Sequence, residues 1–195
     1  MSNAFVIAAN SVTRADVAAA RLGTRFGRMD LSSQLSLLAV EPFAPHFEAF
    51  ARDRIAIVLA ARAGSLPTDV AYWHARHEPG GLSPTLFTYT LPSAAIGEIA
   101  IRHRLTGPNL CFVGTSREVL TEAAGLLQTD EADACVAVFT QVVSPALTQM
   151  IPLPEIARAE AVFIGRNGPG LAELGENRRD METLCATLRA QKLTK

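Results

Sequence analysis

Five short apolar runs, separated by segments with helical spacing, constrain the fold most. The runs cover residues 4–9, 55–60, 109–113, 134–143 and 160–165. Short runs rich in branched side chains are typical of strands buried between two helical layers. Helical patterns lie between them, at 13–22, 31–40, 69–76 and 117–127. The alternation predicts an α/β protein with a parallel or mixed sheet.

The stretch 86–116 shows the most organised pattern in the chain. Thr90 is expected to cap a helix whose first turn holds Pro92 and which ends near residue 104. Gly107-Pro108 predicts a turn, and residues 109–113 predict a short buried strand. Thr115 and Glu118 have the spacing of a capping box, which predicts a second helix. The predicted order is therefore helix, turn, strand, turn, helix.

Composition narrows the class of protein. The chain has 195 residues, 49% of them hydrophobic, which is enough for one domain with a packed core. A net charge of -1 with scattered basic residues gives no electrostatic basis for binding nucleic acid. No apolar run reaches the roughly 20 residues that span a bilayer, and the N-terminus lacks the form of a signal peptide. A cytoplasmic protein without a membrane span is expected.

Three cysteines, Cys111, Cys135 and Cys185, lack metal-like spacing and lie in apolar surroundings. Buried thiols are expected, with no metal site and no cofactor.

The stretch 86–116 resembles the N-terminal half of β-ketoacyl synthases, which are thiolase-like condensing enzymes. In that family a small-residue helix with an AGHIAI-like centre leads into GLRGP, a strand, and a turn that carries the nucleophilic cysteine. The matching text here is AIGEIAI at 95–101 and LTGP at 105–108. Weaker matches are Arg28-Met29-Asp30 before a helix and the DEAD sequence at 130–133 before an apolar strand.

This resemblance covers about residues 50–165, and more weakly the chain from residue 4. It implies a thiolase-like half: a mixed, mostly parallel sheet with helices on both faces. The chain would form a single domain over residues 1–195, in which 166–195 are a helical C-terminal extension. That extension is expected to cover sheet surface that the second half of a full synthase would bury.

The catalytic residues of the family are not matched. Ser116 occupies the position of the nucleophilic cysteine. The four histidines, at 46, 74, 77 and 103, match none of the family's motifs, and its catalytic histidines come from the missing half. Ser116 is therefore expected to cap a helix, with no catalytic residue in the chain and no enzymatic activity.

A condensing-enzyme half without a nucleophile resembles chain-length factors, and in particular the small chain-length-factor component of aryl polyene biosynthesis. The resemblance implies a heterodimer with an active β-ketoacyl synthase subunit, and an indirect association with acyl carrier protein. The expected partner interface is Asn109, Leu110, Cys111, Phe112, Val113, Ala94 and Ile96. The expected tunnel-facing side chains are Phe87, Tyr89 and Leu91, one of which would limit the length of the partner's acyl chain.

Two alternatives stay open at this point. The first is a homodimeric module that binds an acyl chain or an acyl carrier protein. The second is an acyltransferase that uses Ser116 as the acyl acceptor, which would need a base that the sequence does not place.

Overall fold

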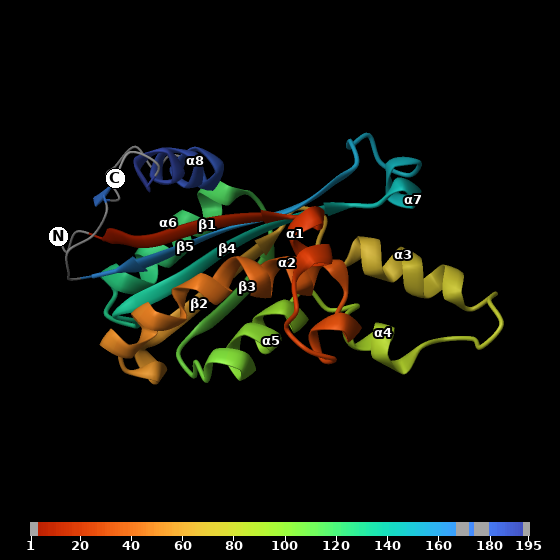
Figure 1. The fold of residues 1–195 in the computed structure, drawn as a ribbon, viewed down its shortest axis with the longest axis horizontal. Helices are drawn as coiled ribbons and strands as arrows, with labels where there is room; N and C mark the ends of the chain where they lie inside the picture. Colours follow the sequence, from red (N-terminus) through yellow and green to blue (C-terminus); the bar gives the residue numbers. More distant parts are fainter. Residues whose placement is uncertain (1–3, 167–171, 174–179, 193–195) are drawn as a thin grey trace.

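A six-stranded mixed sheet organises the computed structural model, which describes residues 4–166, 172–173 and 180–192 (Figure 1). The strand order is β3-β2-β4-β5-β1-β6. The strands are β1 (Phe5–Thr13), β2 (Ile55–Ala61), β3 (Asn109–Val113), β4 (Ala134–Val143), β5 (Ile156–Gly165) and β6 (Ala172–Glu173).

The helices pack on both faces of this sheet (Figure 1), as predicted. They are α1 (Arg14–Ala19), α2 (Leu31–Val40), α3 (Leu66–Ala75), α4 (Pro84–Thr88), α5 (Ala94–His103), α6 (Ser116–Gln128), α7 (Pro145–Thr148) and α8 (Met181–Lys192). Short 3-10 helices cover Phe26–Arg28, Glu41–Ala49 and Arg52–Arg54. The predicted bounds of α2, β3 and β4 are confirmed to the residue.

The sheet is mixed, as expected, but it has fewer parallel strand pairs than the prediction implies. Strand β2 pairs in parallel with β3 and with β4. Among the described strands, the other pairs, β4 with β5, β5 with β1 and β1 with β6, are antiparallel. The prediction of a mostly parallel sheet is corrected here, because the strand directions of β1 and β5 depend on tertiary pairing that local patterns do not report.

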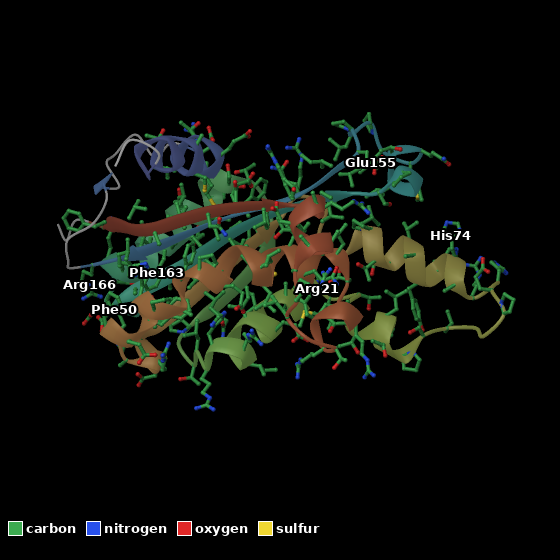
Figure 2. All side chains as sticks on the ribbon, viewed as in Figure 1. Arg21, Phe50, His74, Glu155, Phe163 and Arg166 are labelled. Atoms are coloured by element: carbon green, nitrogen blue, oxygen red, sulfur yellow. The ribbon has the colours of Figure 1, made fainter. Side chains whose placement is uncertain are left out.

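Alternation along β2 divides the core into two layers. Ile55, Ile57 and Leu59 face the side of α2 and α5, while Ala56 and Val58 face the side of α6. Every residue of β2 and of β4 is buried, which explains why both strands are continuous apolar runs. On the α2 side, Phe163 of β5 contacts the rings of three phenylalanines, and Figure 2 shows one of them, Phe50, beside it.

Helix α8 supplies part of the layer on the opposite face. It packs against β1, β5 and α6, and its Met181 and Cys185 are buried. The C-terminal segment thus covers part of a sheet face, while the expectation that the second half of a full synthase would bury this surface stays a prediction. The expectation that the segment is helical fails at residues 172–173, which form β6 because they pair with Phe5 and Val6. The helical prediction for residues 167–171, 174–179 and 193–195 lies outside the described residues.

The stretch before β3 folds differently from the expectation in one place. Helix α5 begins at Ala94 with Ser93 as its N-cap, so the prediction that Thr90 caps it is wrong. The Thr90 hydroxyl instead donates to the carbonyl of Phe87 at 2.8 Å. The preceding Ser83-Pro84 starts a separate short helix, α4, whose N-cap Ser83 accepts from the backbone of Leu86. Thr90 therefore closes the last turn of α4.

Helices α3 and α4, with the loop between them, form an arm that extends beyond one end of the sheet (Figure 1). His74 lies on this arm, away from the sheet (Figure 2). The arm carries exposed apolar side chains, including Trp73, which is stacked against the Arg76 guanidinium at 3.3 Å.

No helix among the described residues has both the length and the apolar character that crossing a bilayer requires.

Candidate functional site: the β3 edge and the cavity beside Ser116

Strand β3 is the outer strand on its side of the sheet. It pairs with β2 from Ile57↔Asn109 to Ala61↔Val113, and within the described chain no strand pairs with its other side. The prediction of a buried strand is wrong, because Asn109, Leu110 and Val113 are exposed. Val113 exposes 65% of its surface although it is apolar. An exposed edge with apolar side chains is a site for pairing with another chain.

The apolar surface continues past the end of β3. A methyl group built on Gly64 would lie 3.1 Å from Val113 Cγ2 and 3.8 Å from Pro92 Cγ. The end of β3 and the segment before α5 are therefore neighbours. Leu91, which precedes Pro92, is 64% exposed. We call Leu91, Leu110 and Val113 the β3 edge surface.

The other expected interface residues divide between surface and core. Cys111 and Phe112 are partly buried and pack against opposite layers of the core. Ala94 is partly buried, but Ile96 is only 5% exposed and belongs to the core on the α2 side. The Ile96 side chain therefore packs within the core of this chain and is not part of the candidate interface surface.

The three expected tunnel-facing residues also separate. Phe87 and Leu91 are exposed, and the Phe87 ring lies 5.5 Å from that of Tyr72. Tyr89 is buried, and its hydroxyl donates to Glu98 Oε1 at 3.0 Å. Arg25 Nε donates to the other oxygen of Glu98 at 2.8 Å. Tyr89 thus completes an internal polar cluster, and Phe87 and Leu91 remain able to reach a partner.

Tyr89 offers a test of this cluster by pH. Burial raises the pKa of its hydroxyl to about 12, and the hydrogen bond to Glu98 adds to the rise. Since the unfolded phenol titrates near pH 10, its contribution to stability is complete below pH 10. That contribution is lost as the pH rises from 10 to 12. We expect the free energy of unfolding to fall more steeply over this interval in the wild type than in Tyr89→Phe.

Urea unfolding at several pH values measures that difference, and absorbance at 295 nm follows the phenol directly. Tyr72 is the other tyrosine in the chain, so Tyr72→Phe serves as the matched control. Parallel pH profiles for wild type and Tyr89→Phe would contradict the buried cluster.

Ser116 is the first residue of α6, and Gly114 and Thr115 separate it from the end of β3. Thr115 caps the helix: its backbone N–H donates to Glu118 Oε2 at 2.7 Å, and its hydroxyl accepts from the Glu118 N–H. The predicted capping box is confirmed, although the capping hydroxyl belongs to Thr115 and not to Ser116. Ser116 is left half-buried at the edge of a cavity of about 400 Å³.

The cavity lies between the start of α6, strands β4 and β5, and the start of α8. Its buried polar residues are Gln141 on β4 and Glu160 on β5, which are 5% and 3% exposed. Arg158 Nε lies 3.1 Å from Glu160 Oε1, and the Gln141 amide oxygen accepts from the same guanidinium when that amide is oriented to satisfy it. Burial raises the pKa of Glu160, and the charge of Arg158 opposes the rise.

The cavity lacks the groups for acyl condensation in the part of the chain that the structure describes. The described residues that line it include no cysteine and no histidine. His46 and His103 lie against phenylalanines on the other face of the sheet, and burial lowers the pKa of His103. Burial also raises the pKa of the Cys111 and Cys135 thiols, which disfavours the nucleophilic thiolate.

Sequence reasoning missed Gln141, Arg158 and Glu160 as neighbours. The sequence did carry one signal: the apolar run 134–143 contains the polar Gln141, and the apolar run 160–165 begins with Glu160. Only the register of β4 with β5, which pairs Phe139 with Glu160 and Gln141 with Arg158, brings them to one place.

Comparison with solved structures identifies the fold. A chain of the ishigamide ketosynthase/chain length factor structure superimposes with a TM-score of 0.71 at 19% identity, covering 88% of this chain and 65% of that one. A chain of the ketosynthase ApeO in complex with its chain length factor ApeC, from Xenorhabdus doucetiae, gives 0.66 at 14% identity, covering 85% and 80%. The AntDE ketosynthase bound to a hexaketide, in complex with the acyl-carrier protein AntF, gives 0.64 at 14% identity, covering 86% and 63%.

No family model matches the chain, and no curated protein matches it. The structural likeness, at identities below 20%, shows a shared fold, and it confirms the predicted α/β thiolase-like architecture. The chain spans about 65% of the length of the first of these neighbours.

Proposed function

We propose that this chain is a non-catalytic, chain-length-factor-like partner of a β-ketoacyl-ACP synthase. The observation that carries the proposal is the β3 edge: an outer strand with exposed apolar side chains, whose free side no described strand covers, in a fold shared with ketosynthase/chain length factor structures. An open edge of this kind is an aggregation hazard for a lone chain. A partner subunit that covers the edge would remove that hazard, which explains why the chain can keep an exposed apolar strand.

In this proposal the two subunits meet along β3. Edge strands that align offer each other backbone N–H and C=O groups, while Leu91, Leu110 and Val113 supply apolar area. Phe87 on α4 and Leu91 before α5 are exposed, and in this proposal they extend the contact toward the partner's acyl tunnel. The tunnel-shaping role therefore falls to these two side chains, since Tyr89 is occupied with Glu98.

The absence of catalysis is supported by chemistry at the Ser116 cavity. Condensation needs a thiolate to carry the acyl chain and donors that stabilise the oxyanion. Among the described residues, the cavity offers a helix-start serine with no imidazole beside it. The proposed setting is fatty-acid-type or polyene biosynthesis in the cytoplasm, with acyl carrier protein bound through the ketosynthase subunit.

Co-expression with the ketosynthase encoded nearest to this chain tests the proposal, with size-exclusion chromatography and native mass spectrometry as readouts. We expect a 1:1 complex in which acyl groups are found on the ketosynthase and none on this chain, in the wild type and in Ser116→Ala alike. A stable homodimer that ignores every neighbouring ketosynthase would favour the homodimeric acyl-binding module. An adduct lost in Ser116→Ala would favour the acyltransferase.

A further inference from the structure

Helix α8 packs against β1, β5 and α6. Among its residues with described side chains, Met181 and Cys185 are buried, and Leu184 is partly buried against the same layer. The Cys185 thiol faces the carbonyl of Asn10 at 3.3 Å. A helix of 12 residues is marginal on its own in water, so α8 depends on this docking to remain helical.

One described polar link between α8 and the sheet passes through Arg158. Arg158 of β5 donates to both carboxylate oxygens of Glu182, at 2.9 and 2.7 Å. The same guanidinium is shared with the buried Glu160, 3.1 Å away. The Glu182 side chain is 62% exposed, so the pair is open to screening by salt on its α8 side.

The start of α8 is also a wall of the cavity beside Ser116. Asp180 and Glu182 line it together with Ser116 of α6 and with Gln141 and Glu160 of the sheet. Movement of α8 away from the sheet would remove that wall and leave the buried carboxylate of Glu160 accessible from one more side.

We propose that α8 is a strap that undocks from the sheet as a unit, that the Arg158–Glu182 pair holds it closed, and that undocking opens the cavity beside Ser116. The rest of the sheet stays folded when the strap opens, because β2, β4 and β5 are buried within the two core layers. The opening is promoted by ionic strength, since salt weakens the pair that links α8 to β5.

The three cysteines of the full chain supply a test with internal controls. Cys185 lies on the strap, Cys135 is fully buried in β4, and Cys111 lies partly buried on β3. Labelling by iodoacetamide, followed by peptide mass spectrometry, gives the rate at each thiol. Cys185 will label faster than Cys135, because local undocking exposes it without global unfolding.

Replacing Glu182 by glutamine removes the charge pair while leaving the buried Arg158–Glu160 contact in place. We expect Cys185 labelling to rise by roughly three- to tenfold, and further in Glu182→Lys, with Cys135 unchanged. Sodium chloride at 0.5 M (roughly the range in which surface pairs are screened) will raise the wild-type rate in the same direction. Glu122→Gln on α6 is the matched control and leaves both rates unchanged, because Glu122 is exposed and lies on a different helix.

Two results would contradict the proposal that α8 undocks as a strap. The first is a Cys185 rate that neither Glu182 substitution changes. The second is a rise at Cys135 equal to that at Cys185, which would mean that the whole fold opens together.

Discussion

Replacing Gly107 by alanine will lower the free energy of unfolding by about 3 kcal/mol or more. A Cβ atom at this position would lie 2.3 Å from the carbonyl oxygen of Ile55 and 3.0 Å from that of Asp53. Both are backbone atoms, so no rotamer change can relieve the overlap. The turn must move away from β2, where Ile57 N–H donates to the Pro108 carbonyl at 2.9 Å.

The substitution is therefore expected to weaken the pairing of β3 with β2. Urea unfolding followed by far-UV circular dichroism measures it. Gly125→Ala is the matched control, because Gly125 lies within α6 and a methyl group added there would meet no atom within 4 Å beyond its own helix backbone and chain neighbours. That substitution should leave stability unchanged or raise it by up to about 1 kcal/mol. A Gly107→Ala protein within about 0.5 kcal/mol of wild type would contradict the close approach.

Replacing Val113 by aspartate will weaken binding to the proposed ketosynthase partner by about 100-fold or more. The side chain is 65% exposed in this chain, so the substitution should leave the fold intact. In the proposed complex it would place an unpaired carboxylate in an apolar contact, where desolvation costs several kcal/mol. Isothermal titration calorimetry on the separately purified subunits, or pull-down from co-expression, measures the loss.

Ile101→Asp is the control for this experiment. Ile101 is 62% exposed and equally apolar, but it lies on α5 beside Arg25 and Phe26, away from the β3 edge surface. We expect its effect on binding to stay within about threefold, the scale of a surface substitution. Equal loss of binding in both variants would mean that the effect is not specific to the β3 edge surface, and unchanged binding in Val113→Asp would remove β3 from the interface.

The helices and strands that the sequence predicts well have strong local signals. The bounds of α2 match because Asp30 accepts from the Ser33 N–H at the start of a helical apolar pattern. The capping box of Thr115 and Glu118 is likewise a contact between residues three apart. The N-cap of α5 was predicted wrongly because Thr90 and Ser93 are both residue types that suit a cap. Ser93 takes that position, and the Thr90 hydroxyl donates to the Phe87 carbonyl of α4.

The candidate site was less predictable, because its residues are defined by neighbours far along the chain. An apolar run such as 109–113 can be a central or an outer strand, and its place at the edge follows from β2 pairing with β4 on the other side. The interface role expected for Ile96 and the tunnel role expected for Tyr89 likewise depend on neighbours far along the chain, which local patterns do not report. Both side chains turn inward because α5 and the segment before it pack against the core.

The amino-acid sequence alone determined the alternation of strands and helices, the capping box of Thr115 and Glu118 and the turn at Gly107, since each depends on residues within a few positions of one another. Tertiary structure decided which strand is left unpaired, which apolar residues face solvent, and which polar residues meet at the Ser116 cavity. Gln141, Arg158 and Glu160 lie on two strands and become neighbours only through antiparallel register. Pairing of that kind is set by the burial of whole strands, so no local pattern contains it.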